Sequence, residues 1–146
     1  MKTVLFDIDG TLANIEHRRV FLDSKRPDWK RFNDAIGDDT PNTAVVSLYQ
    51  TLWNDPEYEL ILVTGRNEKF REVTEQWFFW NDIPMGEMFM RKDNDSRADH
   101  FVKQDILDHL LGMGKNIIFT VDDRQQVVDM WRRNGITCLQ CDVGNF

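Results

Sequence analysis

Aspartate pairs end two of the most apolar segments of this sequence. The stretch VLFDIDGTLAN carries Asp7 and Asp9 directly after its apolar run, and the stretch NIIFTVDD ends on Asp122 and Asp123. A third apolar run, ELILVTGR, ends on a threonine, a glycine and an arginine. Carboxylates that lie close together repel one another unless a cation neutralises them. If the three segments meet in the fold, they predict a site for a cation and an anionic ligand.

Phosphoryl transfer is the chemistry that such a set could perform. Carboxylate oxygens suit Mg²⁺, which keeps several waters and accepts one or two carboxylates together with phosphate oxygens. A carboxylate can also attack phosphorus as a nucleophile, provided that a metal or cationic groups offset the repulsion. Lys103 and the hydroxyl group of Thr64 could supply part of that help.

Each of these residues also has a plain structural interpretation. An aspartate after a strand often stabilises a turn or caps the next helix. Lys103 could simply pair with Asp99, four residues earlier on a helix. Thr64 and Gly65 could form an ordinary strand-to-helix turn. Agreement of all these signals at one sheet edge favours the functional interpretation.

The surrounding pattern predicts an α/β fold. Segments that are apolar on both faces alternate with amphipathic helical segments, which is typical of a Rossmann-like parallel sheet with helices on both faces. Ligands bind beyond the carboxyl ends of the strands in such sheets, where the acidic pairs stand. Strands are expected at 3–7, 59–66, 88–90, 116–123 and 136–140. Helices are expected at 28–36, from Thr40-Pro41 onward, after Asn67, from Asp99 to Gly112, and up to Asn134-Gly135.

Residues 14–40 interrupt this alternation and predict a small insertion after the first strand. Trp29, Phe32 and Ile36 recur there at helical intervals and predict one apolar helix face. In the helix after Asn67 the corresponding face is predicted to carry Phe70, Val73, Trp77 and Trp80. The insertion is too short for a large cap domain, so we expect an open site. Residues 1–146 suit one domain.

Composition limits the classes of function. The apolar share of 41 % supports a sizeable core, and no apolar run approaches the roughly 20 residues that span a bilayer. The first residues do not form a signal-peptide core, so a cytoplasmic location is expected. A net charge of −7 argues against coating long stretches of nucleic acid, but it allows a small anionic substrate at a locally basic site.

Cys138 and Cys141 form a C-x-x-C spacing, which can indicate a redox pair or half of a zinc site. The stretch ITCLQC reads as a strand, and an odd spacing places the two side chains on opposite faces. No second Cys/His pair completes a zinc set in the sequence. A structural role is therefore expected for both.

The ordered set DIDGT, TGR, Lys103 and VDDR closely resembles the haloacid-dehalogenase (HAD) superfamily of phosphotransferases. The stretches RKDNDSRADHFVKQDIL and VDDRQQVVDMWRRNGITCLQ, with the GNF ending, resemble more narrowly the 3′-phosphatase domains of bacteriophage polynucleotide kinases. The similarity covers nearly the whole chain and is weakest in residues 14–40. It implies an HAD fold and a Mg²⁺-dependent phosphomonoester hydrolase.

The resemblance also implies roles for individual residues. Asp7 is expected to be the nucleophile, and Asp9 the general acid and then the base. Thr64 and Lys103 would hold the phosphoryl group. The metal would be held by Asp7, by Asp122 and by the backbone carbonyl of Asp9. Asp123 would lie close to these ligands. Substrate contacts would come from Gly65, Arg66, and Arg18 or Arg19.

The substrate is left open at this point. A nucleotide or polynucleotide 3′-phosphate is expected, but free nucleoside monophosphates and other small phosphate esters stay plausible. The sequence has no G-x-x-x-x-G-K-[ST] loop, because GMGKN lies between an expected helix and strand, so no kinase domain is expected in it.

Two non-enzymatic alternatives fit the sequence less well. A signalling receiver domain places its acidic pair early and its phosphorylated aspartate in mid-chain, which is the reverse of the order here. A non-catalytic binding protein on an HAD scaffold would have lost the nucleophile or the lysine, and both are present.

Overall fold

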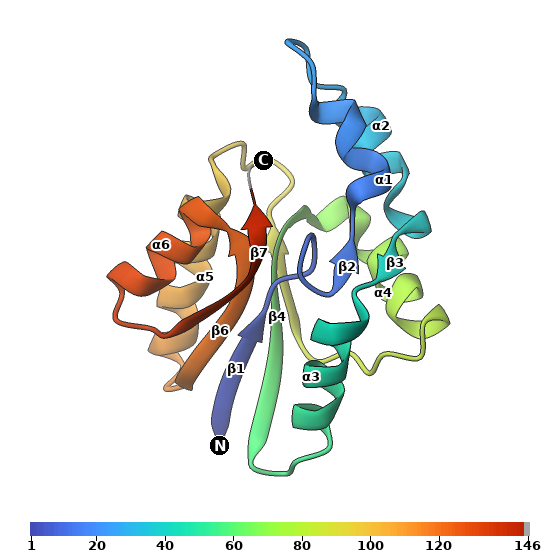
Figure 1. Ribbon diagram of the computed structural model, residues 1–146. Helices are drawn as coiled ribbons and strands as arrows, with labels where there is room; N and C mark the ends of the chain where they lie inside the picture. The colour runs from blue at the N-terminus through green and yellow to red at the C-terminus, as the bar shows by residue number, and fades with distance from the viewer. Residues whose placement is uncertain (145–146) are drawn as a thin grey trace.

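Five parallel strands form the central sheet, in the order β5-β4-β1-β6-β7 (Figure 1). The computed structural model describes residues 1–144, and the last two residues of the GNF ending lie outside the described residues. The sheet strands are β1 (Lys2–Phe6), β4 (Tyr58–Asn67), β5 (Met88–Arg91), β6 (Asn116–Arg124) and β7 (Cys138–Gly144). The predicted α/β fold is confirmed.

Helices cover both faces because the central strands are apolar on both. Val4 and Phe6 of β1 contact one core cluster and Leu5 contacts the other. The first cluster is completed by helices α3 (Thr43–Trp53) and α4 (Arg71–Trp80). The short 3₁₀ turn η3 (Glu68–Phe70) directly precedes α4. The second is completed by α5 (Asp99–Gly112) and α6 (Gln125–Arg133). The two layers are visible on opposite sides of the sheet in Figure 1.

The insertion stands on a two-stranded antiparallel ladder beside the main sheet. Strands β2 (Ala13–Asn14) and β3 (Thr40–Pro41) form its base. Between them lie α1 (Glu16–Arg19), η1 (Val20–Leu22), α2 (Trp29–Asp34) and η2 (Ile36–Asp38). This small two-stranded insertion rises above the carboxyl end of the sheet (Figure 1), and residues 1–144 contain no large cap domain.

Three local predictions were wrong. Thr40-Pro41 does not open a helix: it forms β3, and α3 begins at Thr43 after Asn42, because the chain must pair with β2 on leaving the insertion. An edge position of this kind tolerates the missing N–H of Pro41. Asp99 is the first residue of α5 rather than its cap, since its carboxylate binds two arginines. The last strand begins and ends later than expected, at Cys138 and Gly144.

Two apolar faces also differ from the prediction. In α4, Trp77 and Phe78 are buried, whereas Trp80 is exposed. In the insertion, Phe32 and Ile36 are buried, whereas Trp29 is 55 % exposed. Only two of the three residues predicted for the buried face of the insertion are therefore buried.

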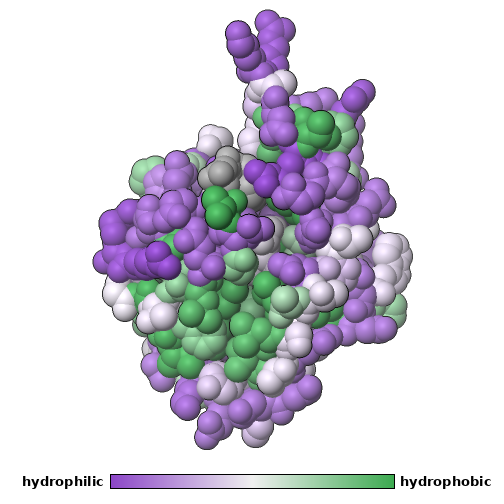
Figure 2. Space-filling model, in the orientation of Figure 1, coloured by the Kyte–Doolittle hydropathy of each residue, from purple (hydrophilic) through white to green (hydrophobic). Residues whose placement is uncertain are grey.

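The cysteines lie on opposite faces of β7, as predicted. Cys138 belongs to the cluster under α5 and α6, and Cys141 packs against the cluster under α3 and α4. On the face that carries α3, Figure 2 shows hydrophobic residues gathered over the sheet beside this helix. No helix formed by residues 1–144 is long and apolar enough to cross a membrane.

Candidate active site

Asp7, Lys103 and the aspartate pair of β6 meet at the carboxyl edge of the sheet. Asp7 follows β1, and its backbone N–H donates to the carbonyl of Val121 on the neighbouring strand (3.0 Å). The Lys103 ammonium, carried by α5, donates to Asp7 Oδ1 and to Asp122 Oδ2, each at 2.8 Å. Thr11 Oγ1 donates to Asp7 Oδ2 (2.9 Å). The sheet edge thus brings together residues that are far apart in the sequence.

An acidic triad lies at the centre of this edge. One carboxylate oxygen from each of Asp7, Asp122 and Asp123 lies within 4.8 Å of the others, and all three side chains are buried. Burial raises the pKa of Asp7 well above its usual value, and the charge of Asp122 adds to this, against the lowering effect of Lys103. Burial and Asp122 likewise raise the pKa of Asp123 to about 6. The site therefore favours any cation that relieves these charges.

Two features of the triad fit a metal ion. Asp123 Oδ1 is buried and has no hydrogen-bond partner among the described residues. Gly10 adopts a φ of +77°, and a Cβ there would collide with the Asp123 carboxylate. Only glycine lets the loop after Asp9 lie this close to β6. Lys103 keeps its charge, because Asp122 and Asp7 raise its pKa against the lowering effect of burial.

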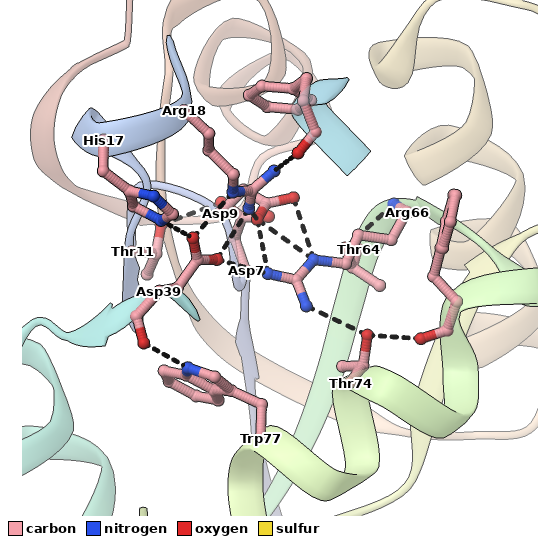
Figure 3. Close-up of polar contacts among 12 residues, drawn as sticks. Asp7, Asp9, Thr11, His17, Arg18, Asp39, Thr64, Arg66, Thr74 and Trp77 are labelled. Carbon is pink, nitrogen blue, oxygen red and sulfur yellow. Dashed lines mark hydrogen bonds and ion pairs between the residues drawn. The ribbon is translucent and has the colours of Figure 1, made fainter. Parts of the chain in front are cut away.

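Asp9 is held by two arginines (Figure 3). Arg18 Nη2 donates to Asp9 Oδ1 at 2.5 Å, and Arg66 Nη2 donates to the same oxygen at 2.7 Å. Burial would raise the pKa of Asp9, but the charges of Arg66 and Arg18 outweigh burial and hold it well below its usual value. The carboxylate of Asp9 is therefore bound by the two arginines, and a metal contact through its backbone carbonyl stays a prediction.

Asp39 holds the same two arginines from behind. It accepts hydrogen bonds from Arg18 Nε (2.7 Å), from Arg66 Nη2 (3.2 Å) and from the ring of His17 (2.6 Å). Its backbone carbonyl accepts from the Trp77 indole (2.7 Å), which ties the insertion to α4. We call Asp9, Arg18, Arg66 and Asp39 the arginine clamp. Figure 3 shows that the clamp joins the insertion to the ends of β1 and β4.

Thr64 and Gly65 occupy the end of β4. Thr64 is fully buried, and its Oγ1 accepts from the backbone N–H of Arg66 (3.1 Å). A Cβ on Gly65 would lie 2.6 Å from an oxygen of Asp99, whose carboxylate binds Arg91 (2.5 Å) and Arg124 (2.8 Å). Glycine at this position therefore makes room for an ion-pair network along the rim of the site.

A cleft of about 610 Å³ opens over these groups. Asp7, Asp9, Lys103 and the β6 aspartates reach it together with Gly65 and Arg66. Its walls come from the insertion, from η3 and from the segment before α5, through Trp29, Phe32, Asn33, Lys69, Phe70, Arg91 and Arg97. Its mouth therefore combines aromatic rings with cationic side chains.

Arg19 is not brought into this cleft. It forms an ion pair with Glu16 (2.9 Å) and lines a smaller pocket of about 190 Å³ with Gly10 and Asp142. Arg18 is the arginine of the insertion that reaches Asp9, so the structure separates two residues that the sequence could not. The roles expected of Thr64, Gly65, Arg18 and Arg19 stay predictions.

Sequence reasoning did not identify Asp39 or His17. Asp39 stands beside Asp38 in the stretch GDDTP, and nothing in the sequence distinguishes the buried residue from its exposed neighbour. The sequence predicts Asp99 only as a cap or a partner of Lys103, whereas its carboxylate binds Arg91 and Arg124. A buried arginine needs a carboxylate partner, but the sequence does not show which arginine is buried.

Replacing Asp39 with Asn should destabilise the protein. The change leaves two largely buried arginines against one carboxylate, and breaking a buried ion pair typically costs about 3–5 kcal/mol. Urea unfolding measures the loss, and Asp38→Asn, an exposed neighbour, should change stability by no more than about 0.5 kcal/mol. Equal stability of the two variants would show that Asp39 does not support the arginine clamp.

Comparison with known proteins places this site in a family. Residues 1–146 match a family model described as the phosphatase domain of polynucleotide kinase PNKP. In a structure of the Pnkp1/Rnl/Hen1 RNA repair complex, one chain is 31 % identical with a TM-score of 0.84, over 99 % of this chain and 43 % of that one. A protein of Autographa californica nuclear polyhedrosis virus, named as a bifunctional polynucleotide kinase/RNA ligase, is 27 % identical over 90 % of this chain and 18 % of its own length.

More distant structures share the fold. An HAD family enzyme of Bacteroides thetaiotaomicron, solved with magnesium and inorganic phosphate, has a TM-score of 0.58 at 14 % identity, over 100 % of this chain and 96 % of that one. An HAD-like hydrolase of Streptococcus pneumoniae has a TM-score of 0.66 at 14 % identity, over 96 % of this chain and 84 % of that one.

The sheet and its match to this family define an HAD-like phosphatase domain, an enzyme of the class that hydrolyses phosphomonoesters. Within that class, the chain belongs to the family of polynucleotide kinase PNKP phosphatase domains. The resemblance drawn from DIDGT, TGR, Lys103 and VDDR is confirmed. The chain spans less than half of the RNA repair protein and about a fifth of the viral one, so it corresponds to one part of those longer proteins.

Proposed function

We propose that this domain is a Mg²⁺-dependent phosphatase that removes 3′-phosphates from nucleotide or polynucleotide ends through an aspartyl-phosphate on Asp7. The observation that carries the proposal is that two acids, Asp7 and Asp9, lie at one sheet edge in electrostatically different surroundings. Asp7 binds Lys103 and has a carboxylate oxygen within 4.8 Å of one from each β6 aspartate, whereas the Asp9 carboxylate binds Arg18 and Arg66. Membership of the PNKP phosphatase family supports the choice of a polynucleotide end.

Asp7 is the nucleophile in this proposal. One of its carboxylate oxygens forms a bond to phosphorus, and the bond from phosphorus to the leaving alcohol oxygen breaks. Lys103, 2.8 Å from Asp7 Oδ1, offsets the charge of the incoming phosphoryl oxygens and holds the carboxylate in one orientation. Thr64 is proposed to bind a phosphoryl oxygen. Water then attacks phosphorus, which releases phosphate and restores the Asp7 carboxylate.

The acidic triad fits a metal, and Mg²⁺ is the ion proposed. Asp7, Asp122, Asp123 and the Asp9 carbonyl would hold it, and the partnerless Asp123 Oδ1 offers a free ligand atom. Bound there, Mg²⁺ would neutralise the carboxylates and the phosphate dianion. The HAD enzyme of Bacteroides thetaiotaomicron is itself recorded with magnesium and phosphate.

In this proposal, Asp9 is the general acid of the first step and the general base of the second. The arginine clamp keeps it ionised in the free protein, which is the form that a base needs to activate water for the second step. For the first step it must hold a proton for the leaving oxygen. Entry of a phosphate dianion beside Asp9 opposes ionisation and therefore favours that proton.

The cationic rim favours a substrate with more than one phosphate or with a phosphate flanked by a nucleoside. Cationic side chains line the cleft beyond the acidic edge, namely Lys69 and the two arginines Arg91 and Arg97, which are ion-paired with Asp99 and Asp95. They are few, and the net charge of the chain is −7, so contacts should be confined to the terminal nucleotides. Free nucleoside monophosphates are the second candidate, because the same cleft could hold one nucleotide.

A substrate screen with metal arms tests this proposal. With Mg²⁺, 3′-phosphorylated oligonucleotides should give the highest kcat/KM, above nucleoside 3′-monophosphates, 5′-phosphorylated oligonucleotides and sugar phosphates. Activity should be lost in EDTA and be low in Ca²⁺, which takes more ligands at longer distances than Mg²⁺. A sugar phosphate turned over much faster than any 3′-phosphorylated nucleotide would refute the proposed substrate class.

A further inference from the structure

Trp29 is a large aromatic side chain left exposed at the wall of the cleft. It begins α2 of the insertion, and 55 % of its surface is exposed although Phe32, one turn later, is buried. The cleft that it lines is the same one that Asp7, Asp9 and Lys103 reach. An isolated exposed tryptophan needs no explanation by itself. However, Trp29 lies on the wall of this cleft and is held in place by its neighbours, and this combination needs an explanation.

Trp29 is connected to the catalytic edge by three successive contacts. Its ring meets Phe32 edge to face, with centroids 5.6 Å apart and planes at 86°. The Phe32 ring lies over the Arg18 guanidinium, whose central carbon is 4.3 Å from the ring centroid. Arg18 in turn donates to Asp9. The contacts fix Trp29 relative to Asp9 while more than half of its surface stays open.

The side of the cleft on which Trp29 stands is the side of the leaving group. The proposed function places the phosphoryl group against Asp7, with its oxygens near Lys103, and the leaving oxygen beside Asp9. Asp9 is held by Arg18 of the insertion, so the alcohol half of the ester extends toward the insertion wall. For a nucleotide 3′-phosphate, that half is the nucleoside that carries the base.

We propose that Trp29 binds the substrate by stacking on the base of the 3′-terminal nucleotide. The assignment rests on the proposed function and names the residue that would recognise the leaving nucleoside. Stacking on an aromatic side chain accepts every base, because each base has a π-face. The contact would therefore favour nucleotides over sugar phosphates without selecting a sequence. Lys69, which lines the same cleft, would then meet the next phosphate of the strand.

The test removes the indole from the enzyme and the base from the substrate. The variants are Trp29→Ala, Trp29→Phe and a control, Trp80→Ala, which removes a 68 %-exposed tryptophan of α4 that does not line the cleft. The substrates are a 3′-phosphorylated oligonucleotide and the same strand with an abasic 3′-terminal nucleotide. Steady-state kinetics with Mg²⁺ give kcat and KM for each pair.

For the complete strand, we expect Trp29→Ala to lower kcat/KM by roughly 5- to 150-fold, the range reported for one stacked base, mainly through KM. Trp29→Phe should recover most of the loss, because a smaller ring still stacks. The abasic strand should be turned over equally by Trp29→Ala and the wild type, and Trp80→Ala should match the wild type on both. The tryptophan fluorescence of the Asp7→Asn variant should fall when the complete strand is added. This quenching should be absent in the double variant Asp7→Asn/Trp29→Phe.

Two different failures can be told apart. If the wild type turns over the complete strand but Trp29→Ala lowers kcat/KM equally for both strands, Trp29 supports the fold of the insertion and does not stack on the base. If Trp29→Ala has no effect on either strand, Trp29 does not contribute to substrate binding and the proposed stacking is refuted. If the wild type turns over neither strand but hydrolyses another phosphate ester, the proposed function fails and the assignment of Trp29 fails with it.

Discussion

The Asp7→Asn variant should fold and show no measurable phosphomonoester turnover. The amide cannot attack phosphorus, and its oxygen no longer carries the charge that helps to hold a metal. Shape and hydrogen bonding are largely kept, because the amide oxygen can still accept from Lys103 or from Thr11. Turnover is measured with p-nitrophenyl phosphate and a 3′-phosphorylated oligonucleotide, and folding by circular dichroism. Asp129→Asn, an exposed aspartate of α6, is the matched control.

A readout besides activity comes from metal binding. The pKa of Asp7 is raised in the folded protein, so its ionisation costs stability as the pH rises above the unfolded value of about 4. At neutral pH, added Mg²⁺ should therefore raise the Tm of the wild type, and raise that of Asp7→Asn less. Without metal, the variant should be no less stable than the wild type. Substantial turnover by folded Asp7→Asn would remove Asp7 from the role of nucleophile.

The sheet and its acidic edge could be predicted because strand order and residue type agree there. β1, β4 and β6 are apolar on both faces, so their sequences identify buried parallel strands without help from tertiary contacts. Once they lie side by side, Asp7, Asp122 and Asp123 must meet at the carboxyl edge. Lys103 could be placed near them because α5 begins close to the same edge.

The arginine clamp could not be predicted, because it depends on where the insertion folds. Arg18 and Arg19 are equivalent in the sequence, yet one is fully buried against Asp9 and the other pairs with Glu16. Asp39 joins the clamp only because β3 pairs with β2 and returns the chain to the sheet. Such contacts depend on long-range geometry, for which a periodic pattern carries no signal.

Trp29 shows the limit of periodicity itself. Helical spacing places it on one face with Phe32 and Ile36, and that spacing is typical of a buried face. However, α2 has only six residues, and Phe32 already fills the space over Arg18. Among residues 1–144, no helix or strand covers Trp29 fully. A residue predicted to lie in the core therefore lines the cleft instead.

The Asp9→Asn variant should lose rate in a way that depends on the leaving group. A general acid or base typically contributes about 10²–10⁴-fold, so turnover of a 3′-phosphorylated oligonucleotide should fall by that order. p-Nitrophenyl phosphate should lose less, because nitrophenolate departs without a proton. Only the second step, which needs a base to activate water, should still suffer for that substrate.

Asp9 is also a structural partner of two buried arginines, and this effect has to be separated from proton transfer. Because its folded pKa is lowered, the ion pairs add stability above the unfolded pKa of about 4 and lose it as the pH falls. The stability deficit of Asp9→Asn should therefore be largest near neutral pH and shrink toward pH 3. Asp39→Asn serves as the control, because it loosens the same arginines but keeps the Asp9 carboxylate. We expect Asp39→Asn to lower turnover of both substrates by a similar factor, and Asp9→Asn to lower them unequally. Equal losses in Asp9→Asn would show that this residue only supports the arginine clamp and does not transfer the proton.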